Sequence, residues 1–469
     1  MLSSKSRLFV YSRYAARCSL NGLLALVLSA CSPGNVDNNE LADSAATHPG
    51  LGSIMEVKRS GDAYTLVRDG KPYLVKGAGM GLLDATAIPQ IELLKKSGGN
   101  SFRTWNVPER KVLDRAHELG LTVALGLDVQ RERHGFDYDD PVAVEQQFER
   151  IKKEVLDYRD HPSIIAWFIG NELNLNLKNP KVYDAVNDIA KFIKKVDPNR
   201  LVTSTTAGID PELAAMIQQR APALDFLSIQ VYGGIFDLQE ALDEIDWKFP
   251  LMVTEWGTEG HWEVDATTWG APIEFNSREK ADHYQRAHDE VLSKMNSRLI
   301  GNYAFLWGQK QERTPTWYGM LTEQNEPTAV VDVMVKIWTG RWPAQTAPKI
   351  KRLLLNNSPA ASNLSLSAGQ TVDAKLELLD DQAGLDYEWL LKRESTATQS
   401  GGDAEDLPDD LTAVQKFANQ SSVTVTAPDH PGAYRLLVYA RNTVGQVAHA
   451  NFPFQVVCAS SGNCETPND

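Results

Sequence analysis

The 469-residue sequence lacks an excess of basic charge, a long apolar run and a dinucleotide-binding glycine motif. Its 61 acidic residues outnumber 47 Lys and Arg, and the formal net charge of −14 makes nucleic acid a poor partner. The apolar run "LLALVLSA" is too short to cross a bilayer as a helix. No glycine fingerprint follows the first predicted strand, and we expect no cofactor. The length allows two or three domains.

Cysteine is scarce, and Cys31 ends a segment with the features of a signal peptide. Basic residues, the short apolar run and small residues precede it. The sequence "LSAC" resembles the bacterial lipobox, in which the cysteine is lipidated and becomes the mature N-terminus; a plain secretory signal is the alternative. We therefore expect a lipoprotein signal over residues 1–31, a flexible polar tether over 32–53 and a lipid anchor at the cell envelope. Ser32 follows the cysteine, and the absence of Asp at this position resembles lipoproteins that are sent to an outer membrane.

The other cysteines lie close to the two ends of the chain. Cys18 would leave with the signal. Cys458 and Cys464 bracket "ASSGN" near the C-terminus. In an exported protein such a pair is typical of a small disulfide loop rather than a metal site.

Short apolar strands alternate with amphipathic helices between residues 54 and 340. This alternation predicts a parallel sheet. Eight units in this length fit a closed (β/α)₈ TIM barrel of the α/β class better than an open doubly wound sheet. The predicted strands lie within residues 73–81, 100–107, 121–129, 164–172, 202–208, 225–234, 249–257 and 299–308.

The pattern changes after a linker over residues 341–350. Alternating β segments separated by Gly, Asp, Asn and Pro predict an immunoglobulin-like β-sandwich over 351–458, with Trp389 in its core and a tail over 459–469. The stretch "SGGDAEDLPDD" is one long acidic loop. We interpret the sandwich as a spacer; carbohydrate binding is the alternative.

The chemistry of such a barrel lies where its strands end. Two carboxylates at these ends, Glu172 on strand four and Glu255 on strand seven, suit the cleavage of a glycosidic bond. One would protonate the leaving oxygen, and the other would attack the sugar or stabilise its cation. The alternative is that each glutamate solvates a loop or pairs with a lysine. Other strand ends carry Arg103, Trp105, Asn106, Asp128, Asn171, Gln230, Tyr232, Trp256 and Trp307.

Three segments resemble one enzyme family. "HPSIIAWFIGNELN" resembles the acid/base segment of the glycoside hydrolase family 2 TIM-barrel domain. "FPLMVTEWG" is similar to the nucleophile strand of that domain and of the wider clan of retaining barrel glycosidases, and "YTLVRDGKPYLVKGAGMG" is similar to the start of the family 2 barrel. The resemblance covers residues 54–340.

The resemblance implies a role for each matching residue. Glu172 would be the acid/base and Glu255 the nucleophile, while Asn171 would bond the sugar 2-hydroxyl. Arg103 and Tyr232 would orient Glu255. Trp307 would be the platform under the sugar at the cleavage point.

The chain also departs from the family pattern. A typical family 2 enzyme has a sandwich and an immunoglobulin-like domain before its barrel, and the segment before residue 54 has no room for them. The strand-six sequence Gln230-Val231-Tyr232 differs from the His-x-Tyr of family 5 barrels, the second choice of family. These departures favour small retaining barrels that act on glucans, including transglycosidases.

Further aromatic and polar residues follow the later strands. Aromatic side chains bind the apolar faces of pyranose rings, so Trp256, Trp262, Trp269 and Trp317 are candidates for substrate subsites, with loop packing as the alternative. The stretch with Glu132 and His134 resembles a magnesium-ligand segment of some family 2 galactosidases. It is equally a polar loop beside the sugar, and we predict no metal.

Together these patterns predict a retaining β-glycosidase that acts by double displacement on a neutral β-linked polysaccharide or oligosaccharide, with β-glucan as the first choice. The expected partner is a carbohydrate, and the only expected membrane contact is the lipid anchor. The alternatives are a β-glucan glucanosyltransferase and a catalytically inactive barrel that binds glycan. The intact set of Glu172, Glu255, Arg103 and Tyr232 argues against the inactive barrel.

Overall fold

The computed structural model describes residues 53–245, 247, 249–295, 297–380, 382–399 and 401–458. The predicted signal peptide, with Cys31, lies outside these residues. Cys458 is disulfide-bonded, and Cys464, its predicted partner, also lies outside them. In the described part of the chain no helix is both long and apolar enough to cross a membrane.

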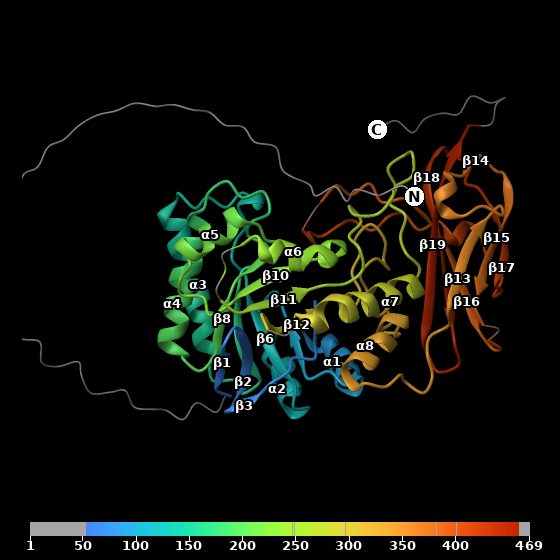
Figure 1. The fold of residues 1–469 in the computed structure, drawn as a ribbon. Helices are drawn as coiled ribbons and strands as arrows, with labels where there is room; N and C mark the ends of the chain where they lie inside the picture. The colour runs from blue at the N-terminus through green and yellow to red at the C-terminus, as the bar shows by residue number, and fades with distance from the viewer. Residues whose placement is uncertain are drawn as a thin grey trace, which may run out of the picture. The chain divides into compact units, whose positions relative to one another are not determined.

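Parallel strands form a closed barrel, as the sequence predicts (Figure 1). Strand five is interrupted at Ser204: its first half, β8, pairs with β7, and its second half, β9, pairs with β10. The two halves of strand five therefore close the ring of barrel strands. The barrel strands are β4 (Gly77–Gly79), β5 (Ser101–Arg103), β6 (Thr122–Leu127), β7 (Ile164–Ile169), β8 (Leu201–Thr203), β9 (Thr205–Ala207), β10 (Leu227–Gln230), β11 (Leu251–Glu255) and β12 (Leu299–Ala304).

Helices between the strands cover the outside of the barrel, so β6 and β7 are buried on both faces and read as continuous apolar runs. Local sequence signals start the helices. The Asp140 side chain caps α3 ahead of a proline, and Asn276 with Glu279 forms a capping box on α7. The helices are α1 (Ile88–Lys96), α2 (Arg110–Glu118), α3 (Pro141–Tyr158), α4 (Lys181–Val196), α5 (Pro211–Arg220), α6 (Leu238–Asp243), α7 (Ser277–Arg286) and α8 (Ala329–Thr339).

A small antiparallel sheet closes the N-terminal end of the barrel. It consists of β1 (Met55–Ser60), β2 (Ala63–Arg68) and β3 (Lys71–Pro72). Met55 and Leu66 pack in one apolar cluster with Phe168 and Tyr303 from the barrel strands. Since this end is sealed by apolar packing, the opposite end, where the strands finish, is left for polar residues.

The C-terminal domain is a two-sheet sandwich, orange to red in Figure 1. Trp389 is buried in its core, as predicted. The first strand begins at Ile350, the last residue of the predicted linker. One sheet has the order β13 (Ile350–Leu355), β15 (Thr371–Leu378), β17 (Ser422–Thr426); the other has the order β14 (Ser365–Ser367), β19 (Val447–Val457), β18 (Gly432–Arg441), β16 (Asp386–Arg393).

A buried polar cluster joins the barrel to the sandwich. The Glu274 carboxylate pairs with Lys280 of α7 and accepts hydrogen bonds from the hydroxyls of Thr314 (2.6 Å) and Thr316 (2.8 Å). Asn451 of β19 donates to the same carboxylate from the sandwich side. Burial alone would raise the pKa of Glu274, but the charges of Lys280 and His449 and the hydrogen bonds from Lys280 and Thr314 together lower it to about 2. The Glu274 carboxylate is therefore charged and has partners from both domains.

Replacing Lys280 with methionine is expected to lower the free energy of unfolding by about 3–5 kcal/mol, because it leaves the Glu274 carboxylate buried without its cation. Urea unfolding followed by circular dichroism measures the effect. The double variant Glu274→Gln, Lys280→Met should recover part of the loss, because the neutral amide leaves no unpaired buried charge and its oxygen can still accept from the threonine hydroxyls. Lys191→Met on the exposed face of α4, where the side chain is 62% exposed, is the control and should change stability by about 0.5 kcal/mol or less. A Lys280→Met protein as stable as the wild type would contradict the assignment.

Candidate active site

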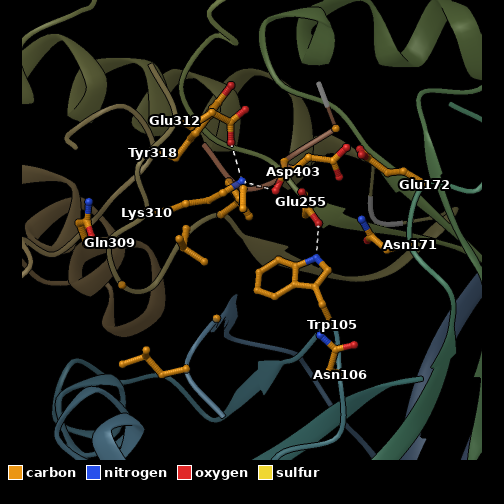
Figure 2. A pocket seen from close by; sticks show the side chains of 18 of the residues that line it. Trp105, Asn106, Asn171, Glu172, Glu255, Gln309, Lys310, Glu312, Tyr318 and Asp403 are labelled. Atoms are coloured by element: carbon orange, nitrogen blue, oxygen red, sulfur yellow. Dashed lines mark hydrogen bonds and ion pairs between the residues drawn. The ribbon is translucent and has the colours of Figure 1, made fainter. Parts of the chain in front are cut away.

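A pocket of about 780 Å³ opens where the barrel strands end (Figure 2). Glu172 and Glu255, the two predicted catalytic carboxylates, both line it. Trp105, Asn171 and Tyr232 line it as well. The structure thus brings residues from strands two, four, six and seven to one place, as the βα alternation requires.

Four side-chain donors converge on the Glu255 carboxylate. Its Oε1 accepts hydrogen bonds from Arg103 Nη1 (3.1 Å) and Trp105 Nε1 (2.8 Å). The same oxygen accepts from Gln230 Nε2 (2.7 Å), and Oε2 accepts from the Tyr232 hydroxyl (2.7 Å). These donors fix the orientation of the carboxylate, as a nucleophile requires.

Arg103 links the ends of the two strands that carry Glu172 and Glu255. It is fully buried, and its Nη1 also donates to the backbone carbonyl of Thr254 (3.0 Å) beside Glu255. Its Nη2 donates to Asn171 Oδ1 (3.0 Å), next to Glu172 in the chain. One rigid guanidinium therefore sets the spacing between the ends of β7 and β11.

The amide of Asn171 is held in one orientation. Its Oδ1 accepts from Arg103 Nη2, from Gln230 Nε2 (2.7 Å) and from the Thr205 hydroxyl (3.2 Å). Among the described residues nothing accepts a hydrogen bond from its Nδ2. Because Asn171 lines the pocket, this N–H₂ group can donate to a bound hydroxyl.

Glu172 lies in a different environment from Glu255. Burial raises the pKa of Glu172 to about 8, and the negative charge of Glu255 adds to that shift. None of the described residues donates a hydrogen bond to its carboxyl group. Its backbone has a φ of +49° and is held by a bond from its N–H to the Thr205 carbonyl (3.1 Å). Glu172 therefore carries a proton at neutral pH and can act as a general acid.

Aromatic rings form one wall of the pocket. Phe305 contacts Trp105 and Tyr232 edge-on, with ring centroids 5.6 and 5.7 Å apart. Tyr318 lies 5.3 Å from Tyr232, and Trp262, which is 52% exposed, lies 6.0 Å from it. All five residues line the pocket, so a sugar bound there could contact these rings, and the expected subsite at Trp262 stays a prediction.

The structure corrects the role expected for three of the other tryptophans. Trp256 and Trp307 are 0% exposed and Trp317 is 1% exposed, and each donates its indole N–H to another residue of the protein. An enclosed ring has no free face on which a sugar could stack. The expected platform at Trp307 and the expected subsites at Trp256 and Trp317 are therefore wrong. Trp269 is half-buried and does not line the pocket, and its role as a subsite stays a prediction.

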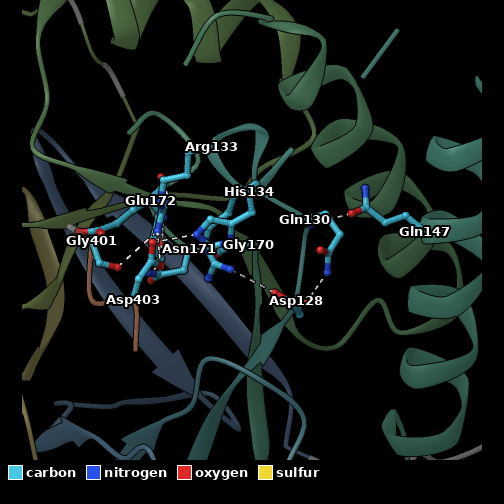
Figure 3. A network of polar contacts seen from close by, with 12 residues as sticks. Asp128, Gln130, Arg133, His134, Gln147, Gly170, Asn171, Glu172, Gly401 and Asp403 are labelled. Carbon is cyan, nitrogen blue, oxygen red and sulfur yellow. Dashed lines mark hydrogen bonds and ion pairs between the residues drawn. The ribbon is translucent and has the colours of Figure 1, made fainter. Parts of the chain in front are cut away.

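Glu132 and His134 are engaged in loop contacts. The Glu132 carboxylate accepts hydrogen bonds from the backbone N–H groups of Lys178 (2.7 Å) and Asn179 (3.0 Å). His134 Nε2 lies 2.8 Å from Asp403 Oδ2 (Figure 3). Within the described ranges no group of three or more His, Cys, Asp or Glu side chains is arranged to hold a metal ion.

Sequence reasoning missed one side of the pocket. Lys310 and Glu312, after the last barrel strand, line it together with residues 401–404 from the sandwich. The available signal was the pair of glycines in the long acidic loop, which indicates a tight turn but not its place in the fold.

Known proteins resemble this chain in part. Residues 76–259 match the family model described as "Glycosyl hydrolases family 2, TIM barrel domain". Among solved structures the chain is similar to Bacteroides uniformis β-glucuronidase 2 (14% identity, TM-score 0.50, covering 86% of this chain and 48% of that one). It is also similar to a Bifidobacterium dentium β-glucuronidase (21%, 0.49, 62% and 50%) and an Eisenbergiella tayi β-galacturonidase (17%, 0.49, 62% and 55%). The chain thus spans about half the length of these structures.

Proposed function

We propose that the protein is a retaining β-glycosidase acting on a neutral β-linked glycan, with β-glucan as the first choice; the match of residues 76–259 to the family 2 TIM-barrel model supports this. Glu255 attacks the anomeric carbon while Glu172 gives its proton to the leaving oxygen. Water then hydrolyses the covalent glycosyl-enzyme, with Glu172 as the base that takes the proton of that water.

One observation carries the proposal: two pocket carboxyl groups have opposite environments. Four donors hold Glu255, whereas none of the described residues donates to the Glu172 carboxyl, and burial raises its pKa to about 8. Double displacement needs this difference, because one group must attack as a carboxylate and the other must arrive protonated.

The neighbouring residues support the same reaction. A sugar over Trp105 and within reach of Glu255 would place a hydroxyl beside Asn171, whose Nδ2 is free to donate. A hydrogen bond to the 2-hydroxyl that strengthens as positive charge develops on the sugar lowers the barrier. Because Arg103 contacts both Asn171 and Glu255, the sugar and the nucleophile keep a fixed relation.

The charges of the pocket support a neutral sugar. Lys310 Nζ is paired with Glu312 (2.8 Å), and Arg131 is paired with Asp128 (3.5 Å). These are the cations that line the described pocket, and each already has a carboxylate partner, which favours a neutral sugar over a uronic acid. The solved structures named above are enzymes for glucuronides and galacturonides, and this arrangement favours a different substrate for this chain.

We expect an aryl β-glucoside to be hydrolysed with a kcat/KM roughly 100-fold above that of the matching glucuronide, since burying an unpaired carboxylate costs several kcal/mol. Parallel assays with aryl β-mannoside and β-xyloside define the sugar. Proton NMR of the first-formed product should show the β-anomer. An α-anomer formed first would overturn retention, and faster turnover of the glucuronide would overturn the neutral substrate.

A further inference from the structure

The sandwich domain contributes directly to the pocket of the barrel. Residues 401–406, here called the sandwich loop, belong to the segment between β16 and β17. Gly401, Gly402, Asp403 and Ala404 line the same pocket as Glu172 and Glu255. The pocket therefore has walls from both domains.

Asp403 anchors the sandwich loop on the barrel. Its Oδ1 accepts a hydrogen bond from Arg133 Nη2 (3.2 Å), and its Oδ2 lies 2.8 Å from His134 Nε2. Both partners belong to the loop that follows β6. The backbone of Gly401 also packs closely against the barrel. Gly401 has a φ of +64°, and a Cβ atom at this position would lie 2.6 Å from the Leu175 side chain.

Two more contacts fix the sandwich loop on its other side. Lys310 Nζ donates to the carbonyl of Gly402 (2.6 Å), and the backbone N–H of Arg313 donates to the Glu405 carboxylate (2.7 Å). Contacts on both sides, from the loops after β6 and after β12, hold residues 401–405 as a fixed wall.

The sandwich loop lies on the side of the pocket where Glu172 acts. Arg133 donates from Nη1 to the backbone carbonyl of Glu172 (3.4 Å) and from Nη2 to Asp403 (Figure 3). A general acid stands beside the leaving oxygen, so the leaving sugar extends past Glu172, away from Glu255. Figure 2 shows Asp403 facing the same pocket space as the two glutamates.

We propose, resting on the proposed function, that the sandwich loop forms the wall of the leaving-group subsite and that Asp403 selects the sugar released. Each oxygen of a carboxylate accepts about two hydrogen bonds, and Arg133 and His134 use one on each. The Asp403 side chain is 28% exposed, so its remaining lone pairs can accept hydroxyl groups of a leaving sugar.

The test compares two substrates that differ only in the leaving group. A β-glycosyl fluoride releases a single atom and does not fill the leaving-group subsite, whereas a β-linked disaccharide releases a sugar. Glucosyl fluoride and a glucose disaccharide serve first, or those of the sugar that the aryl glycosides select. Asp403→Ala should lower kcat/KM for the disaccharide roughly tenfold and leave that for the fluoride within about twofold.

A second variant tests the wall without removing a contact that holds it. Ala404 lines the pocket and is exposed, so Ala404→Trp should narrow the subsite and again slow the disaccharide alone. Asp409→Ala is the matched control, because the Asp409 side chain is 75% exposed, pairs with Arg393 and does not line the pocket. It should leave both substrates unchanged.

The outcomes separate this proposal from the function on which it rests. A wild-type protein that turns over neither substrate overturns the proposed function. If the wild type is active and Asp403→Ala slows the fluoride as much as the disaccharide, the subsite assignment is wrong. Fluoride leaves with little help from a general acid, so damage to Glu172 would also slow the disaccharide alone, but it would shift the pH at which kcat/KM falls. A disaccharide-specific loss that comes with such a shift means that Asp403 acts through Arg133 on Glu172 and overturns the assignment, whereas an unchanged pH profile supports it. Unchanged disaccharide turnover in Ala404→Trp overturns it as well.

Discussion

Replacing Glu255 with glutamine is expected to lower kcat/KM by about 10⁴-fold or more, because an amide cannot attack the anomeric carbon. The fold should survive, since glutamine has nearly the same shape and its oxygen can still accept from Arg103. Steady-state kinetics on an aryl β-glycoside measures the loss. Glu323→Gln is the matched control: Glu323 is an exposed carboxylate of the same pocket, and its replacement should change the rate less than about threefold.

Removing the Glu255 side chain allows a second readout of the same prediction. In Glu255→Gly a small anion such as azide can occupy the vacated space and attack the sugar from that side. The product should be the α-glycosyl azide from a β-glycoside, and its formation should rise with azide concentration. A Glu255→Gln protein with near wild-type turnover would show that another group is the nucleophile.

The effect of replacing Glu172 on the rate should depend on the leaving group of the substrate. Glu172→Gln removes the proton donor, and general acid catalysis contributes roughly 10²–10⁴-fold. A disaccharide needs that proton and should lose most of this factor, whereas a dinitrophenyl glycoside leaves without it and should slow only at the later hydrolysis step. Azide should then speed turnover and give the β-glycosyl azide, because it replaces the water that Glu172 would activate. Equal losses for both substrates would contradict the assignment.

The pH profile tests the same residue without a structural change. Since burial and Glu255 raise the pKa of Glu172 to about 8, the group is protonated below that pH and loses its proton above it. The kcat/KM for a disaccharide should therefore fall as the pH rises through about 8, and Glu172→Gln should lack this limb. The two carboxyls interact, so the observed value belongs to the pair.

Much of the barrel and its reaction centre could be predicted from sequence, because both depend on local patterns. Each strand is a short apolar run followed by a helix, so the residues at the strand ends can be located in the amino-acid sequence. Glu172 and Glu255 end such runs. Once eight strands close into a barrel, their ends meet, which brings Arg103 and Tyr232 within reach of Glu255. That these two residues would orient Glu255 was implied by the family resemblance, and both contacts are present.

The roles of the tryptophans could not be assigned in this way, because the position of a residue after a strand does not tell where its side chain points. Successive side chains of a strand point to opposite faces. Glu255 points into the pocket, so Trp256 points into the helix layer, where its ring lies 5.4 Å from Tyr284 of α7. Trp307 similarly lies 5.6 Å from Trp338 of α8. Residue type suggested sugar binding, but these rings pack the helices against the barrel.

The sandwich loop lay beyond sequence reasoning for another reason. Asp403 follows Arg133 by 270 positions, and neither residue carries a pattern that names the other. The acidic character of the loop was visible, but contact between domains is decided by how the sandwich docks. A loop that reads as solvated can therefore be a wall of the pocket.

The buried charges of Glu274 and Lys280 bear on how such enzymes can be recombined. Because the sandwich is fastened to α7 and to the loop after β12 through this cluster, a barrel grafted onto a foreign partner would carry an ion pair deprived of Asn451. A design that exchanges only the barrel would therefore lose both stability and one wall of its pocket. The barrel and the sandwich are best transferred together.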